Sequence, residues 1–509
     1  MNCRRGSFLL PIVAQKHTPR YAKNIYNLRR CPYNVITEPA DICQNPFYAK
    51  NMSIGRNENR RMNMDYALIQ GLYWCAYGAV GSYAAFYLQS LGFSGTITGT
   101  VTALACTLAF FLPMVLSPII DEGKKLTSTG ALLGIIAVQL IVGSAVLCFT
   151  RAGIIPGTIF IIWMGLMWAL LPLCTEVCVD AEHCGYRMEY STGRAFGSFS
   201  YVVTSLTLGK LLETYPYTVI TKLALFALVL LAAAVFSAGR SLGKQRAKMQ
   251  PENAGDRTAA ADTKRGGDAN LGSNTERGSD AKRSSDAKRG GDTECGSGAA
   301  KGMEQPCRGK SIPAFLKQYR DFGLLLLGLG LVLTGDGAVA VFLINIVEEL
   351  GGTAADMGYI NAAYAALEIL ALLLWRRIAD KKYGDTVLAL SICFFVGKTL
   401  FFALVRSVPA IYPGAVIHFA GYGLYTPAIV AYTIKKIPYE DSAKAQSLAA
   451  SMSTLGVILS GVSCGILIDR MSVRKTMLLF AGVGAAGAIL CIIAIIKMRK
   501  QKAIMPAKE

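Results

Sequence analysis

The stretch RGSDAKRSSDAKRGGD, residues 277–292, is a degenerate polar repeat that separates two strongly apolar blocks of the chain. The segment around it is rich in Gly, Ser, Asp, Lys and Arg, and buries too little apolar surface to offset its ordering entropy. On both sides, apolar runs of roughly 20 residues recur, which is the length of a helix that crosses a ~30 Å hydrocarbon core. The pattern predicts an all-α polytopic membrane protein with a disordered linker.

Six apolar spans are expected before this linker and six after it, giving twelve transmembrane helices in two pseudo-symmetric halves. The expected spans are 66–90, 95–119, 127–149, 155–179, 191–212 and 216–239, then 320–347, 355–379, 384–406, 409–433, 443–468 and 474–497. The expected domains are a disordered tail (1–63), a first six-helix bundle (64–239), the linker (240–314), a second bundle (315–498) and a terminal tail (499–509). Met62 and Met64, just before the first span, are candidate alternative translation starts.

The composition excludes an ordinary soluble domain, because 53% of the 509 residues are hydrophobic. The net charge of +19 lies mainly in the tail, the linker and short loops. This placement favours the positive-inside rule over a nucleic-acid partner, and predicts a multi-pass plasma-membrane protein with both termini in the cytoplasm. One exception is the last outer loop, where Arg470, Arg474 and Lys475 have only Asp469 as a nearby acid.

The fourteen cysteines are scattered and indicate no disulfide framework. Cys174, Cys178, His183 and Cys184 lie close in sequence, but their spacing fits no standard zinc site, so we expect no metal. The chain also lacks an HExxH motif or a GxSxG motif in a suitable context. We therefore expect neither an enzyme nor a cofactor.

Ionisable side chains inside the spans are the main functional signal. Each costs about 2.5–3.5 kcal/mol on insertion scales, so each must face a partner or water. The groups concerned are Glu176, Arg194, Asp336, Glu368, Lys398 and the titratable His418. Asp336 is flanked by glycines, which suits either a loosened span or a structural, helix-breaking role. His418 is either titratable or simply packed.

The fourth and fifth spans bring a carboxylate and a guanidinium to facing helix ends. Glu176 ends one span and Arg194 begins the next, so an antiparallel pair would bring them together. Such a pair could hold substrate hydroxyls or only join two helices. Tyr201 follows Arg194 by about two helical turns and shares its face. Tyr73 and Tyr77 of the first span line the cavity or serve in packing.

Small residues predict where helices approach closely. Gly193 and Gly197 form a small-xxx-small strip beside Arg194, and Gly461 and Gly465 form another in the eleventh span.

The six-linker-six layout resembles the major facilitator superfamily. RRIADKKYG (376–384) resembles its cytoplasmic loop motif, with Asp380 in the acid position, and SPIIDEGKK (117–125) is a degenerate copy with Asp121. The resemblance implies a substrate site near the midplane between the halves, and acids that latch helix ends on the cytoplasmic side.

Within that superfamily, the chain looks like the lactose-permease-like proton symporters. Glu176, Arg194 with Phe196 and Gly197, and Tyr201 stand at places matching that family's motif. In the family the Glu and Arg bind sugar and the aromatic stacks on it. Here Tyr replaces the usual Trp, and a first Arg of the motif is missing.

Glu368, Lys398 and His418 fall where the same family has Glu, Arg and His, a group that couples protonation to sugar binding. Lysine keeps the charge of arginine but loses its planar fork. The family's proton-carrying carboxylate is replaced by Gly421. Either Glu368 or Asp336 carries the proton, or the coupling differs.

The resemblance therefore implies a monomeric, proton-driven symporter of a sugar or related polyhydroxylated solute that works by alternating access. The alternatives are a nucleoside:proton symporter, a drug/proton antiporter, or a transporter-derived sensor that binds solute without moving it.

Overall fold

The computed structural model describes residues 54–121, 127–249, 311–378 and 384–504, which all lie in one compact unit. Within these ranges the chain forms helices and no strands. Nine of the described helical segments are long and apolar enough to cross a membrane. The predicted class, an all-α polytopic membrane protein, is confirmed.

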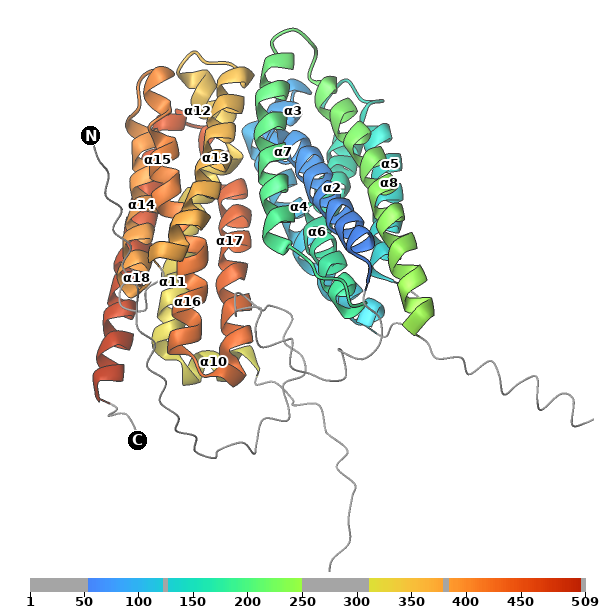
Figure 1. The fold of residues 1–509 in the computed structure, drawn as a ribbon. Helices are drawn as coiled ribbons and strands as arrows, with labels where there is room; N and C mark the ends of the chain where they lie inside the picture. Colours follow the sequence, from blue (N-terminus) through green and yellow to red (C-terminus); the bar gives the residue numbers. More distant parts are fainter. Residues whose placement is uncertain (1–53, 122–126, 250–310, 379–383, 505–509) are drawn as a thin grey trace, which may run out of the picture. The chain divides into compact units, whose positions relative to one another are not determined.

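The helices divide into a first and a second set in chain order (Figure 1). The first set is α2 (Arg56–Val80), α3 (Ala84–Ser90), α4 (Gly95–Asp121), α5 (Ser128–Val146), α6 (Ile154–His183), α7 (Tyr190–Leu211) and α8 (Thr218–Met249). The second is α10 (Ile312–Gln318), α11 (Arg320–Val341), α12 (Leu343–Glu349), α13 (Ala354–Ile378), α14 (Gly384–Leu404), η2 (Pro409–Ile411), α15 (Gly414–His418), η3 (Phe419–Gly423), α16 (Leu424–Lys436), α17 (Tyr439–Ile468) and α18 (Val473–Ile504).

Each of the twelve predicted spans coincides with one of these helices or with a run of consecutive helical pieces. The long helices α2, α7 and α13 are not among the nine most apolar segments. These three carry polar side chains within their predicted spans, among them Gln70, Arg194 and Glu368. Arg194 and Glu368 therefore lie on helices that are weak as membrane spans, whereas Glu176, Asp336 and Lys398 lie on strongly apolar ones.

Three predicted boundaries differ from the structure. Helix α2 begins at Arg56, within the predicted tail 1–63, and Met62 is fully buried. Helix α8 runs to Met249, past the predicted start of the linker, and α10 begins at Ile312, before its predicted end. Polar composition suggested disorder at these places, but packing against the bundle holds the segments in helices.

Each half is held mainly by pairs of helices that are not neighbours in sequence. In the first half α2 packs against α6, α7 and α8, and α5 packs against α6 and α8. In the second half α11 packs against α14, α17 and α18. We call the end where α8 finishes and α10 starts the linker end, and the opposite end the far end.

The two halves meet through glycines at the far end. Helix α4 crosses α17 so closely that a Cβ on Gly461 would lie 2.7 Å from the carbonyl oxygen of Gly99. Gly465 packs in the same way on the backbone of Gly95. The predicted strip at Gly461 and Gly465 is confirmed, because only residues without a side chain let the two backbones approach this far.

Polar contacts reinforce the same end. Asp469, just after α17, accepts hydrogen bonds from Gly95 N (2.8 Å) and Thr96 N (2.7 Å) at the start of α4. A carboxylate there satisfies free N–H groups and the positive end of the helix dipole. Gln89 and Asn345 exchange two hydrogen bonds of 3.0 Å. The far ends of the two halves are thus joined by both packing and hydrogen bonds.

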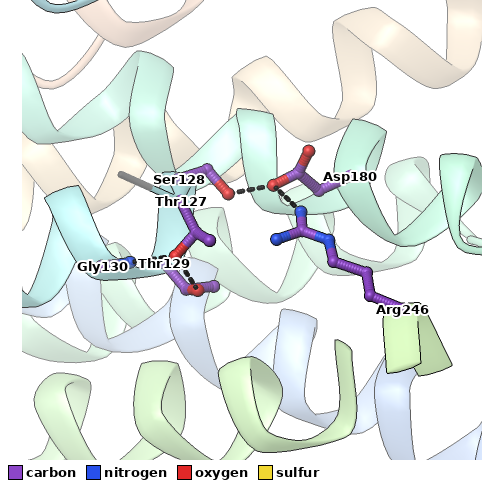
Figure 2. Close-up of polar contacts among 6 residues, drawn as sticks. All are labelled: Thr127, Ser128, Thr129, Gly130, Asp180 and Arg246. Atoms are coloured by element: carbon purple, nitrogen blue, oxygen red, sulfur yellow. Dashed lines mark hydrogen bonds and ion pairs between the residues drawn. The ribbon is translucent and has the colours of Figure 1, made fainter. Parts of the chain in front are cut away.

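At the linker end, two groups of ion pairs each lie within one half. Figure 2 shows Asp180 of α6 between Ser128, which donates a hydrogen bond, and Arg246 of α8, whose Nη2 lies 3.1 Å away. In the second half Asp385 pairs with Lys435 (2.9 Å) and Lys436 (3.3 Å). These pairs fasten helix ends inside each bundle without joining the bundles.

The α4–α17 crossing gives a first prediction. Gly99→Val should force α4 and α17 apart, because its Cβ would collide with the backbone of Gly461. Alkylation of Cys464, which is fully buried one turn after Gly461, should then become faster, as measured by mass spectrometry. Gly134→Val is the matched control, since a Cβ there meets no atom within 4 Å. Equal alkylation rates in both variants would contradict the account.

The Asp469 cap gives a second prediction. Partial burial raises the pKa of this carboxyl, but the hydrogen bonds from Thr96 and Gly95 outweigh it and hold the pKa below its usual range. A lowered folded pKa stabilises the fold fully above the unfolded pKa of about 3.9, and this stabilisation is lost as the pH falls through the folded value. Thermal unfolding should show Asp469→Asn less stable than wild type at pH 6, with a gap that shrinks below about pH 4. A gap that does not change with pH would refute this.

Candidate functional site

Arg194 lies on α7 against the aromatic face of α2. Its Nη1 donates to Ser198 Oγ (3.0 Å), and its Cζ lies 4.3 Å from the centroid of the Trp74 ring. The helix reaches this position through the predicted glycine strip, which is confirmed: a Cβ on Gly197 would lie 2.5 Å from Trp74 Cδ1, and Gly193 packs on the ring of Tyr66 in the same way. The guanidinium thus makes a cation–π contact and a hydrogen bond to one hydroxyl.

Tyr201 joins the same cluster, as its spacing from Arg194 predicted. Its hydroxyl lies 2.6 Å from Ser82 Oγ, and its ring centroid lies 6.1 Å from that of Trp74 and 6.3 Å from that of Tyr77. Tyr73 is buried beside Tyr77, with ring centroids 6.1 Å apart. The three predicted tyrosines are thus brought together by α2 and α7.

Glu176 lies half-buried in α6, which packs on α2. The side chain is not without a partner. That the partner is Arg194 stays a prediction.

The second half holds a buried ion pair. Lys398 of α14 pairs with Asp336 of α11, and the two side chains are only 3% and 14% exposed. His418 Nδ1 lies 3.3 Å from Lys398 Nζ. Because a single buried charge would be costly, the ammonium requires the carboxylate beside it. The sequence named all three residues, but not that Asp336 is the acid paired with Lys398.

His418 is also packed between two tyrosines. Its ring stacks on Tyr364 at 4.2 Å and 10°, and on Tyr422 at 5.4 Å and 12°. Both tyrosines escaped the sequence analysis. A usable signal was present, since Tyr422 lies one turn after His418 and Tyr364 one turn before Glu368.

A π-helical turn, η3, follows His418 and contains Gly421. Pro427, four residues after Gly423, has no N–H to give to that residue's carbonyl, which accounts for the loosened ladder. A Cβ on Gly421 would lie 3.5 Å from the backbone nitrogen of Phe395 on α14. The position of the missing family carboxylate therefore faces α14, one turn before Lys398.

Electrostatic contacts connect the two half-sites. Helix α7 packs on α13, and the charge of Arg194 attracts the half-buried Glu368 carboxylate of α13. Tyr201 lies in the neighbourhood of Glu368 and Tyr364. The arrangement is one polar and aromatic cluster, built from α2 and α7 on one side and α11, α13, α14 and α15 with η3 on the other.

The loop-motif residues stay predictions. Asp121 is the last residue of α4, and Asp380 lies outside the described residues. Cys174, Cys178 and Cys184 are free thiols. Among the described side chains, His, Cys, Asp and Glu form no group of three or more that could hold a metal ion.

The family model described as "MFS_1 like family" matches residues 66–480. No curated protein matches the chain.

Three solved structures with the same fold are distant in sequence. The nucleoside transporter NupG is 14% identical, with 86% of this chain and 99% of that chain covered, and a TM-score of 0.61. A bacterial homologue of the human lysosomal transporter Spinster is 13% identical, with 88% and 99% covered and a TM-score of 0.55. The peptide transporter POT, solved with alafosfalin, is 11% identical, with 86% and 94% covered and a TM-score of 0.57. At these identities the likeness shows the fold alone.

The buried ion pair gives a third prediction. Lys398→Met should lower the free energy of unfolding in mixed micelles by about 3–5 kcal/mol, because Asp336 is left as an unpaired buried carboxylate. The double variant Asp336→Asn with Lys398→Met should recover most of this loss. If the single and double variants are equally unstable, the two side chains do not depend on each other.

Proposed function

The chain belongs to the MFS_1 like family of membrane transporters, and we propose that it is a proton-coupled symporter of a sugar or related polyhydroxylated solute. The observation that carries the proposal is the single cluster in which Arg194 and the aromatic side chains of the first half meet Glu368 of the second, close to the buried Asp336–Lys398 pair. Structural membrane proteins gain nothing from such costly charges unless the charges bind or respond to something.

Substrate recognition is assigned to the first half. Arg194 and Ser198 offer hydrogen-bond donors, and Glu176 offers an acceptor, as hydroxyl groups require. The rings of Tyr73, Trp74, Tyr77 and Tyr201 cluster beside Arg194 and suit the apolar faces of a sugar ring.

Proton coupling is assigned to the second half. Lys398 Nζ is shared between the Asp336 carboxylate and His418 Nδ1. A proton on Asp336 would cancel its charge and release Lys398, and a proton on Glu368 would remove its attraction to Arg194. Because Arg194 faces both the substrate and Glu368, solute binding and carboxylate protonation compete for the same cation. Asp336 and Glu368 thereby take the proton-carrying role of the family carboxylate that Gly421 replaces.

Alternating access is supported by the distribution of contacts between the halves. Glycine packing and hydrogen bonds join them at the far end, while the described ion pairs of the linker end stay within one half. This favours a state closed at the far end. With the positive-inside rule, that end is the outside, and the termini lie in the cytoplasm of a plasma-membrane monomer.

A nucleoside is the second candidate substrate. The specific observation is the number of rings in the cluster, including the parallel Tyr364, His418 and Tyr422, since a nucleobase is recognised by stacking. The nucleoside transporter NupG shares the fold. The uptake experiment below also distinguishes drug/proton antiport and solute sensing from symport.

Uptake into proteoliposomes is the fourth prediction. Wild-type protein should accumulate a sugar from a panel of sugars and nucleosides only under an inward proton gradient. Glu176→Ala and Arg194→Ala should each reduce kcat/KM by about a hundredfold, since each removes a charged hydrogen-bonding group. Lys210→Ala is the matched control, because Lys210 is an exposed residue of the same helix as Arg194.

Each other outcome has a meaning. Accumulation that is indifferent to the gradient, or full activity in both variants, would contradict the proposal. Selective nucleoside uptake would establish the second candidate, export of lipophilic cations would indicate antiport, and binding without accumulation would indicate a sensor.

A further inference from the structure

Two asparagines at the start of α2 clasp the loop that leads into α7. Asn59 pairs with the backbone of Arg187 in both directions: its Nδ2 donates to Arg187 O (3.1 Å) and its Oδ1 accepts from Arg187 N (2.7 Å). Asn63 Nδ2 also donates to Arg187 O (2.8 Å), and its Oδ1 accepts from Glu189 N (2.8 Å). Both side-chain amides are thus used as donor and acceptor on one short stretch of loop.

The clasp lies on the same face of α2 as the aromatic side chains of the site. Asn59, Asn63, Tyr66, Trp74 and Tyr77 are separated by steps of four, three, eight and three residues, which keep one side of a helix with 3.6 residues per turn. The stripe therefore starts with the two amides at the linker end and continues into the aromatic cluster.

Successive residues at the start of α7 contact successive side chains on this face of α2. Glu189, whose N–H is held by Asn63, directly precedes α7 and accepts the backbone hydrogen bond of Gly193 (3.2 Å). Gly193 then packs on Tyr66 and Gly197 on Trp74. Arg194 lies between these two contacts with its guanidinium over Trp74. The glycines have no side chain that could fix the position of α7 along its axis, so the clasp is the directional contact at this end.

We propose that Asn59 and Asn63 are positioning residues that set the register of α7 on α2 and thereby hold Arg194 at its working depth. The proposal rests on the function proposed for Arg194. The two residues do not touch the substrate; they act through the loop that starts α7. Both residues lie in the predicted tail 1–63, so this part of the chain contributes to function although its composition predicts a disordered segment.

The test compares Asn59→Ala, Asn63→Ala and the double variant with Asn57→Ala, an exposed asparagine of the same helix, in full-length protein. Hydrogen exchange at the amides of Arg187 and Glu189 should accelerate in the clasp variants and not in the control. The KM of the double variant for the transported solute should rise about tenfold while kcat stays within about twofold, because Arg194 is misplaced but not removed.

A second readout does not depend on transport. The difference in tryptophan emission between wild type and Arg194→Ala reports the contact between Arg194 and Trp74. The double clasp variant should shift the emission in the same direction, and should add nothing in the Arg194→Ala background. Asn63→Asp keeps the acceptor for Glu189 N but loses the donor to Arg187 O, so it should give intermediate effects and serves if the alanine variants fold poorly.

The outcomes separate the two proposals. Faster exchange at the loop with unchanged emission and KM would overturn the positioning role, as would exchange rates equal to those of wild type. If wild-type protein accumulates no solute, the proposed function fails, while the exchange and emission measurements still decide whether the clasp positions Arg194.

Discussion

The cost of charge inside a bilayer governs where this chain can place its functional side chains. Lys398 lies almost fully buried in a strongly apolar helix, and Asp336 from another helix lies beside it and offsets the cost of its charge. Arg194 has a different environment. It contacts the ring of Trp74 and the hydroxyl of Ser198, and its charge attracts the Glu368 carboxylate. The Lys398–Asp336 pair carries no net charge when both side chains are ionised. We propose that the paired Lys398 serves proton coupling and that Arg194 serves substrate binding.

The fold supports this division through glycine. Helix α7 can bring Arg194 beside Trp74 only because Gly193 and Gly197 let it lie directly on the rings of α2, and α4 can close against α17 only because facing glycines remove the side chains. The first contact brings Arg194 to the aromatic side chains of α2, and the second joins the far ends of the two halves. Glycine contacts alone do not fix how far one helix is shifted along the other. A polar side chain supplies a directional hydrogen bond at each contact: the Asn63 amide in the first and the Asp469 carboxylate in the second.

Much of this was predictable from the sequence, because hydropathy and the cost of buried charge act locally. The apolar runs predicted the helices, and the same cost singled out Arg194, Lys398 and His418. Contacts between helices distant in sequence were not predictable: nothing local pairs Asp336 with Lys398 or stacks Tyr364 on His418. The start of the first helix was wrong for a related reason, since Asn59 reads as a tail residue until the loop it clasps is known. The Glu176–Arg194 pair, Asp121 and Asp380 stay predictions.

The most direct test of the central claim is to record external pH while solute is added to weakly buffered proteoliposomes that carry no imposed gradient. The account predicts that solute entry in wild type removes protons from the outside, and that Asp336→Asn binds solute with similar affinity but removes none, because its side chain can no longer exchange a proton while sharing Lys398. Solute entry without alkalinisation in wild type, or the full signal in Asp336→Asn, would contradict it.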